Sequence, residues 1–292
     1  MVVVAVANSP TLAARDFISL AKPKVIWPHS IILSAAMVLA GWSWMNPGLL
    51  LLTLTGGGLV AAAASTLNCY FDRDIDRMME RTASRPLPAG RLRPEAALAF
   101  GVLTGLCGLL VLVFLVNFAT AAFAAVALLY YLAYTILLKR RSRWGVVIGS
   151  GAGAMTPLIG WAAAGQRFEI IPCLLAAMII LWTIPHFGAL AITRQKDYRK
   201  AGLETWPGRA DYAWMIASSL LLLAASLLIG RLAGLGAFYL GTAVVLGAGL
   251  LYLALRLKGR YALDIARWLY RYSIVYVALI FGTMVIDKLV FR

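Results

Sequence analysis

Four oxygen-bearing side chains stand at regular spacing where an apolar segment ends. The stretch NCYFDRDIDRMMERTASRPLPAG, residues 68–90, directly follows LTGGGLVAAAASTL. Asn68, Asp72, Asp76 and Glu80 are four residues apart, so on a helix they share one face, while Asp74 points elsewhere. Mg²⁺ prefers a few oxygen ligands from the protein together with substrate phosphates. The spacing therefore predicts a magnesium site with Asn68, Asp72 and Asp76 as ligands.

Arginine side chains accompany this acidic stripe. Arg73, Arg77 and Arg81 form a neighbouring stripe displaced by one residue, and guanidinium groups bind phosphate oxygens in pairs. A solvated helix end with local ion pairs, each worth about 0.3–0.5 kcal/mol, would also alternate charge. It would not continue the acidic stripe into apolar sequence through Asn68. We therefore expect a Mg²⁺-bound diphosphate, with Arg73 and Arg77 among its ligands.

A second polar segment, TRQKDYRKAG, repeats the theme at residues 193–202. One acid, Asp197, stands among four cations that we expect to bind substrate: Arg194, Lys196, Arg199 and Lys200. His186, Leu190, Thr193 and Asp197 follow helical spacing along one face. Asp197 is accordingly predicted as a further metal ligand.

A diphosphate head at a membrane surface with an apolar tail among helices describes a polyprenyl diphosphate. Metal and arginine would stabilise the departing diphosphate. The remaining allylic cation would need a cavity that excludes water. These residues predict a prenyl-transferring or prenyl-cyclising enzyme.

The composition defines the elements that must position these groups. Of the 292 residues, 62% are hydrophobic and 13% are charged, against about 25% charged in soluble domains. Runs of about 20 apolar residues cross a bilayer as helices. We predict an all-α integral membrane protein, one domain over residues 1–292, with nine spans: 25–42, 48–68, 96–115, 119–138, 145–164, 170–192, 213–230, 234–255 and 269–288.

The basic residues are unevenly distributed between alternate loops. With the N-terminus in the cytoplasm, all but four of the 27 Lys and Arg residues fall in cytoplasmic segments. The four exceptions are Arg167, Arg231, Lys288 and Arg292. This pattern follows the positive-inside rule, so the net charge of +15 indicates topology and contact with membrane lipid and no nucleic-acid partner. We expect a multi-pass protein of the inner (plasma) membrane, with its C-terminus outside and its active site toward the cytoplasm.

Small and sulfur-containing residues predict packing and no cross-links. Gly145, Gly149 and Gly153 form a small-residue row that favours close helix packing, and Gly56–Gly58 are interpreted in the same way. Three cysteines, Cys69, Cys107 and Cys173, are isolated, so neither a disulfide framework nor a zinc site is expected.

The motifs together resemble a known family. Asn68-x3-Asp72-x3-Asp76 resembles the first signature of the UbiA-type intramembrane prenyltransferases. The run from Asn68 to Leu92 is most similar to the branch that farnesylates protohaem IX, the haem O synthases. Three further stretches share this similarity: LAKPKVI, LKRRSRWGVVIGSGAGAMTPLIGW and LWTIPHFGALAITRQKDYRKAG.

The resemblance implies nine helices around a central cavity open to lipid. It also implies Mg²⁺-dependent transfer of farnesyl from farnesyl diphosphate to a vinyl group of haem B, with water adding to give haem O. Lys196, Asp197 and Tyr198 fall at the family's second motif, and Lys139 is a further expected substrate ligand. His186 matches a family histidine that could face the porphyrin, although it could equally be structural and bond a neighbouring helix.

One loop departs from the family pattern. Where the family reads x-Pro-Met-Leu-Pro after Ala-Gly, this chain reads LETWP at residues 203–207, over the expected mouth of the cavity. A UbiA-type enzyme with another acceptor, or a UbiA-type terpene cyclase, would keep the first motif and could alter this loop. A transporter with Asp72 and Asp76 as an ion site ranks last, because transporters place such acids nearer the membrane midplane.

Overall fold

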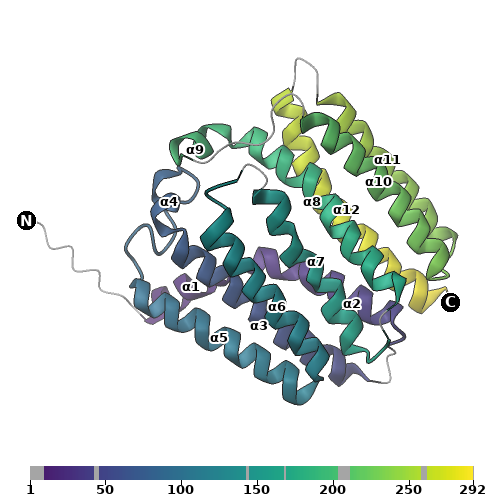
Figure 1. The fold of residues 1–292 in the computed structure, drawn as a ribbon, viewed down its shortest axis with the longest axis horizontal. Coiled ribbons are helices and arrows are strands. Elements are labelled where there is room, and N and C mark those ends of the chain that lie inside the picture. Colours follow the sequence, from purple (N-terminus) through teal and green to yellow (C-terminus); the bar gives the residue numbers. More distant parts are fainter. Residues whose placement is uncertain are drawn as a thin grey trace, which may run out of the picture.

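The computed structural model describes residues 10–42, 46–142, 145–167, 169–202, 211–257 and 262–291. Within these ranges the chain is helical and contains no strand (Figure 1). The elements are α1 (Pro10–Ala21), α2 (Pro23–Leu39), α3 (Pro47–Phe71), α4 (Arg73–Met78), α5 (Pro94–Leu115), α6 (Phe118–Ala133), the π-helical turn η1 (Tyr134–Leu138), α7 (Gly145–Ala163), α8 (Ile170–Thr193), α9 (Gln195–Lys200), α10 (Asp211–Leu232), α11 (Ala237–Arg256) and α12 (Ala262–Val290).

Every predicted span coincides with a helix of this structure, with boundaries that differ by up to three residues except at α12, which begins at Ala262, before the predicted start at residue 269. Seven helices in the described chain are long and apolar enough to cross a membrane: α3, α5, α6 with η1, α8, α10, α11 and α12. The first and fifth predicted spans correspond to shorter apolar helices, Pro23–Leu39 and Val147–Ala163. At about 1.5 Å per residue, α2 is roughly 26 Å long, slightly less than the hydrocarbon core of about 30 Å.

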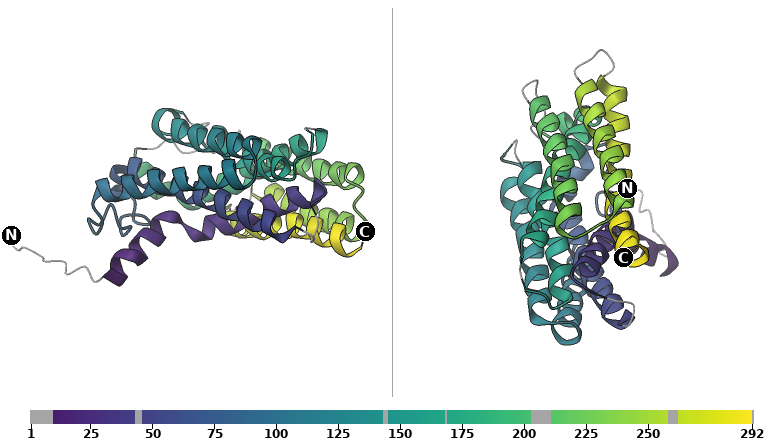
Figure 2. Two further views of the ribbon diagram at one scale, coloured as in Figure 1. Left: turned by 90° about the horizontal axis from the view of Figure 1, so that it is seen from below. Right: turned by 90° about the vertical axis from the view of Figure 1, so that its right-hand side faces the viewer.

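Two apolar cores share a pair of central helices. One core joins α8, α10, α11 and α12, which lie together on the right of Figure 1. The other joins α3, α5 and α6, and α2 and α7 contribute side chains to both. Seen from below in Figure 2, the helices run broadly along the long axis of the molecule. The two halves are therefore held together through α2 and α7, and Val285 of α12 also packs against both cores.

Glycines permit the closest helix contacts. A Cβ atom on Gly160 of α7 would lie 2.4 Å from the carbonyl oxygen of Leu33 in α2, so these backbones touch. A Cβ atom on Gly108 of α5 would lie 2.8 Å from the carbonyl oxygen of Gly56 in α3, and one on Gly149 would lie 2.7 Å from the Tyr134 ring. Gly56 and Gly149 thus confirm the expected close packing, whereas Gly145 and Gly153 make ordinary contacts.

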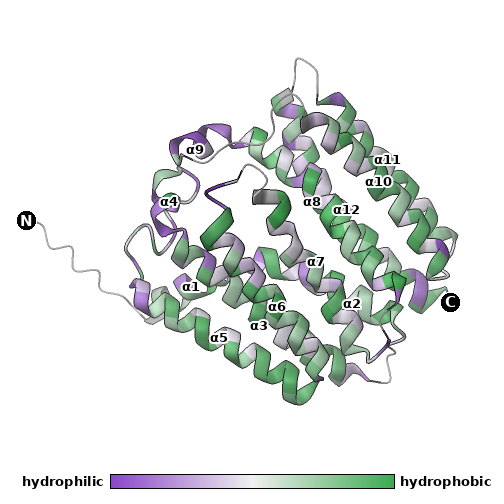
Figure 3. Ribbon diagram, in the orientation of Figure 1, coloured by the Kyte–Doolittle hydropathy of each residue, from purple (hydrophilic) through white to green (hydrophobic). Residues whose placement is uncertain are grey.

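The two polar segments lie at one end of the molecule. Helices α4 and α9 are strongly hydrophilic and lie near each other, away from the apolar bundles (Figure 3). Cys69, Cys107 and Cys173 are free. The expectation that one continuous helix carries the stripe from Asn68 to Glu80 is wrong. Helix α3 ends at Phe71, Asp72 joins it to α4, and Glu80 lies beyond the end of α4 at Met78.

Candidate active site

The α3–α4 junction keeps the first three side chains of the stripe together. The Asp72 N–H donates to the Asn68 carbonyl at 2.9 Å, and the Asp76 N–H donates to the Asp72 carbonyl at 2.8 Å. This four-residue pattern continues through the junction although Asp72 has a non-helical ψ of 3°. Asn68, Asp72 and Asp76 are 6%, 3% and 3% exposed. We refer to these three residues as the Asn-Asp-Asp motif.

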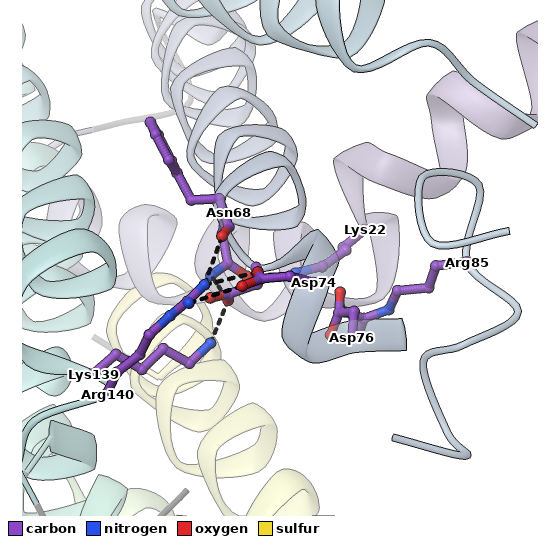
Figure 4. Close-up of polar contacts among 9 residues, drawn as sticks. Lys22, Asn68, Asp74, Asp76, Arg85, Lys139 and Arg140 are labelled. Atoms are coloured by element: carbon purple, nitrogen blue, oxygen red, sulfur yellow. Dashed lines mark hydrogen bonds and ion pairs between the residues drawn. The ribbon is translucent and has the colours of Figure 1, made fainter. Parts of the chain in front are cut away.

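Three cations from separate segments contact this motif. Lys22, between α1 and α2, donates to Asn68 Oδ1 at 3.0 Å. Arg85, in the loop after α4, donates to Asp76 Oδ2 at 2.6 Å. Lys139, directly after η1, forms an ion pair with Asp72 Oδ2. Figure 4 shows Lys139 approaching from one side and Lys22 and Arg85 from the other. We refer to these cations as the cation triad.

The two carboxylate oxygens of Asp72 differ in their hydrogen bonding, which bears on metal binding. Asp72 Oδ2 also accepts from Asn68 Nδ2 at 2.6 Å, but Asp72 Oδ1 is buried and has no hydrogen-bond partner. A buried oxygen without a partner is costly, and a hard cation would satisfy it. Two carboxylates and an amide fit Mg²⁺ when a diphosphate supplies further oxygens. Among the described residues, no group of three or more His, Cys, Asp or Glu side chains could hold a metal.

Asp74 lies outside the motif, as its register predicts. It is exposed and forms two hydrogen bonds with the Arg140 guanidinium, at 2.8 and 2.9 Å. The hydrogen bonds from Arg140 hold the pKa of Asp74 below its ordinary value. Arg140 also donates to the carbonyl of Phe71 at 2.9 Å, which ties it to the end of α3.

The predicted arginine ligands of α4 face solvent. Arg73 donates to the Tyr70 carbonyl at 2.8 Å, and its guanidinium lies 4.7 Å from the centre of the Tyr70 ring. Arg77 is exposed. In this arrangement the motif contacts Lys22, Arg85 and Lys139. Of these three cations, only Lys139 was predicted as a substrate ligand.

The second polar segment packs against the first. Tyr198 of α9 contacts a small apolar cluster formed by Ile75, Met79 and Ala201, which joins α9 to α4 and the segment after it. Burial raises the pKa of Tyr198. Lys200 donates to Glu80 at 2.5 Å. The two motifs are therefore neighbours, as expected from the sequence.

The other predicted ligands of the second polar segment are Asp197 and the cations around it. Asp197 is 8% exposed, but it does not form one metal-binding group with Asp72 and Asp76. All four predicted substrate ligands of this segment are exposed: Arg194, Lys196, Arg199 and Lys200. The loop that departs from the family pattern, Leu203 to Pro207, lies outside the described residues.

His186 lies between aromatic rings and bonds the neighbouring helix. Its ring stacks on Trp182 with centroids 4.4 Å apart, and Tyr270 of α12 lies 5.0 Å away. His186 Nδ1 lies 2.7 Å from Ser273 Oγ, which itself donates to the Tyr270 carbonyl at 2.7 Å. Because a serine hydroxyl carries one proton, both bonds form only when His186 Nδ1 is the donor. Nδ1 thus bonds the neighbouring helix α12, and in the neutral ring Nε2 carries the lone pair.

Sequence reasoning missed Lys22 and Arg85. Lys22 stands in a left-handed conformation, with φ of 52°, directly before Pro23. Lys22 stands in the stretch LAKPKVI and Arg85 in SRPLP. Neither stretch has a spacing that indicates contact with Asn68 or Asp76. Ser273 was also missed, because nothing near it suggests a polar site.

A surface pocket lies far from this site. It has a volume of about 500 Å³ and is lined by Gly236, Ala237, Phe238, Asp287 and Phe291. These residues belong to the ends of α11 and α12 near the C-terminus, whereas α4 lies at the other end of the molecule (Figure 1). This pocket is not the predicted prenyl cavity.

Comparison with known proteins shows the family to which the chain belongs. The family model described as the UbiA prenyltransferase family matches residues 30–278. The "Protoheme IX farnesyltransferase" of Microcystis aeruginosa is 42% identical over 284 residues, covering 94% of this chain and 90% of that protein. The protein of the same name from Symbiobacterium thermophilum is 41% identical over 280 residues and covers 94% of each chain.

Solved structures show the same fold at much lower identity. A structure of digeranylgeranylglyceryl phosphate synthase superposes with a TM-score of 0.77 at 18% identity, covering 94% of this chain and 98% of that one. A UbiA homologue from Archaeoglobus fulgidus, bound to DMAPP and Mg²⁺, gives a TM-score of 0.63 at 16% identity, covering 93% and 99%. The chain therefore belongs to the UbiA prenyltransferase family.

Proposed function

We propose that the protein transfers a farnesyl group from farnesyl diphosphate to a vinyl group of protohaem IX, haem B, and so forms haem O. The observation that carries the prenyl-diphosphate part is the buried Asn-Asp-Asp motif, with Asp72 Oδ1 unsatisfied and three cations beside it. The acceptor is proposed from the relatives named protoheme IX farnesyltransferase, at about 40% identity over 94% of the chain.

The motif and the cation triad would act on the diphosphate. When bound between Asp72, Asp76 and Asn68, Mg²⁺ would neutralise the charge that develops on the leaving group. Lys22, Arg85 and Lys139 would hold the diphosphate oxygens and orient the farnesyl C1 atom toward the apolar interior. Asp197, Tyr198 and the cations of α9 would close the same head-group site from the other polar segment.

The bond changes balance without an external oxidant. The C1–O bond of farnesyl diphosphate breaks, and its electron pair leaves with diphosphate. The vinyl π-electrons of haem B form the new C–C bond to C1, which leaves a cation beside the porphyrin ring. Water adds to that cation and loses a proton, giving the hydroxyl group of haem O. An apolar cavity among the helices would keep water from the allylic cation before this step.

The proposed topology follows the charge distribution. We infer nine spans, with α2 and α7 crossing despite their shorter length, an N-terminus in the cytoplasm and a C-terminus outside. Residues 1–292 then form one polytopic domain in the inner (plasma) membrane, and the Asn-Asp-Asp motif faces the cytoplasm. Basic residues of the loops that flank α4 and α9 support this orientation.

A product assay tests this function directly. The purified protein is incubated with Mg²⁺ and farnesyl diphosphate, with and without haem B, and products are identified by mass spectrometry. We expect haem O only when haem B is present, and none when EDTA removes the metal. A hydrocarbon formed without haem B would instead identify a terpene cyclase, and an inert protein under all conditions would refute prenyl transfer.

A further inference from the structure

The cation triad contains more positive charge than the motif needs. Each member contacts a different residue: Lys22 contacts Asn68, Arg85 contacts Asp76 and Lys139 contacts Asp72. Three cations oppose two carboxylates, because Asn68 is neutral. The group therefore has a net positive charge at the edge of an apolar bundle, where a further cation alone would be repelled.

Two members of the cation triad reach the motif from more exposed positions than the acids occupy. The side chains of Lys139 and Arg85 are 29% and 26% exposed, whereas those of Asp72 and Asp76 are each 4% exposed. Lysine and arginine side chains are long and can pivot while their stems remain packed. The carboxylates are thus fixed by burial and by the α3–α4 junction, and the cationic heads are the parts that can change partner.

A neighbouring ion pair lacks these features. Arg140 follows Lys139 in the chain and pairs with Asp74, but their side chains are 41% and 59% exposed. Asp74 has no buried oxygen without a partner, whereas Asp72 Oδ1 is buried and unsatisfied. This pair therefore provides an internal reference for an ordinary surface interaction.

We propose that the cation triad acts as an exchangeable set of counter-ions for the Asn-Asp-Asp motif. In the protein alone, Lys22, Arg85 and Lys139 neutralise and hydrogen-bond the motif. When metal and diphosphate arrive together, the cationic heads transfer to the diphosphate oxygens, and the freed oxygens of the motif face the metal. This inference rests on the proposed function, and it adds an order: neither metal alone nor diphosphate alone binds well.

Metal alone and diphosphate alone each meet an electrostatic obstacle at this site. Metal alone must displace a cation from Asp72 or Asp76, and it adds positive charge to a group that is already positive. Diphosphate alone approaches two uncovered carboxylates as soon as it attracts the cations. Each ligand removes the obstacle to the other, so their affinities are reciprocally coupled. A merely structural Lys139 would give no such coupling.

Binding of two labelled probes tests this inference. The full-length protein in lipid nanodiscs is dialysed against radiolabelled Mn²⁺, radiolabelled inorganic diphosphate, or both, and both labels are counted. We expect each probe to tighten the binding of the other by about tenfold. Lys139→Met should raise the affinity for Mn²⁺ alone by about fivefold or more, and should lower the affinity for diphosphate by a similar factor.

Matched variants separate charge from folding. Arg140→Met, one residue away, should leave both affinities unchanged, and Lys139→Arg should stay near wild type because it retains the charge. Lys22→Met should change the two affinities in the same opposite directions as Lys139→Met.

Two results would overturn the proposal in distinguishable ways. If wild-type protein binds both probes together but Lys139→Met lowers both affinities, or leaves Mn²⁺ binding unchanged, the exchange is refuted while the proposed function stands. If wild-type protein binds diphosphate under no condition, the proposed function falls, and the exchange falls with it.

Discussion

The two oxygens of the Asp72 carboxylate have different surroundings, and this difference defines its role. Oδ2 accepts hydrogen bonds from Asn68 and Lys139, whereas Oδ1 is buried without a partner. A group kept only for stability would have both oxygens satisfied. The unsatisfied Asp72 Oδ1 is thus the strongest reason to assign a ligand to this site.

Removing either motif carboxylate should abolish turnover without unfolding the protein. We expect Asp72→Ala and Asp76→Ala to lower kcat by about 100-fold or more, because a group that stabilises the leaving diphosphate is lost. Haem O formation and a thermal unfolding curve, measured on the same detergent preparation, check both parts. Asp74→Asn should keep most of the activity, since Asp74 is exposed and pairs with Arg140. Equal losses in all three variants would contradict the assignment.

Ser273 should act on the acceptor site through His186. Ser273→Ala removes the partner of His186 Nδ1, so the ring loses the bond that fixes its orientation and its proton. We expect haem B affinity to fall by about tenfold, which corresponds to a lost hydrogen bond to a buried group, while diphosphate affinity stays constant. Titration of the haem absorbance band measures the first quantity.

His186→Ala provides the comparison for this experiment, because it removes the ring altogether. It should weaken haem B binding at least as much as Ser273→Ala. Unchanged haem titrations in both variants would show that His186 only links α8 to α12.

At the scale of elements, hydropathy was sufficient to predict the long apolar helices, but it did not predict α1 or how the motif bends. Apolar runs predict each span because a bilayer segment must satisfy its own backbone hydrogen bonds. The i, i+4 pattern kept Asn68, Asp72 and Asp76 together. It could not show that α3 ends at Phe71 and leaves Glu80 outside, because a continuous helix and a helix interrupted at Asp72 both satisfy the same four-residue spacing over Asn68, Asp72 and Asp76.

The contacts between elements were the least predictable part of the site. Lys22 and Arg85 reach the motif only because α1, α2 and the loop after α4 fold back on the end of α3. A single sequence contains no local signal for such long-range pairs. Lys139 was expected because it lies in a matching stretch, not because its partner was known.

Close contact between α2 and α7 should make Gly160 intolerant of a larger residue. Gly160→Ala would place Cβ 2.4 Å from the Leu33 carbonyl oxygen, and overpacking of this kind costs about 1–3 kcal/mol. We expect a lower Tm in detergent by scanning fluorimetry, together with reduced activity, because both cores meet at these helices. Gly282→Ala in α12 is the matched control, since nothing lies within 4 Å of its Cβ position. A similar Tm for both variants would mean that α2 and α7 can separate at little cost.

At the scale of the whole molecule, the membrane orientation of the site depends on one short helix. If α2 crosses, α3 runs inward and Asp72 lies on the cytoplasmic side. If α2 does not cross, the ends of α3, α5 and α6 exchange sides. The basic residues of the segments after α3 and η1 would then lie outside, against the positive-inside rule. The ends of α3 and α8 would also lie on opposite sides of the membrane, against the packing of Tyr198 on Ile75 and Met79. The count of spans changes with α2 and α7 together from nine to seven, so the C-terminus alone cannot distinguish these arrangements.

Reporter fusions at three positions distinguish these arrangements. A reporter that is active only in the cytoplasm is fused after Trp44, after Gly90 and after Arg292. We expect it to be silent after Trp44, active after Gly90 and silent after Arg292, because α2 crosses outward, α3 returns and an odd number of spans follows the cytoplasmic N-terminus. Activity after Trp44 with silence after Gly90 would show that α2 stays on the cytoplasmic surface and that the Asn-Asp-Asp motif faces the outside. The outcome matters for chemistry as well as topology, because it determines which compartment must supply the prenyl diphosphate.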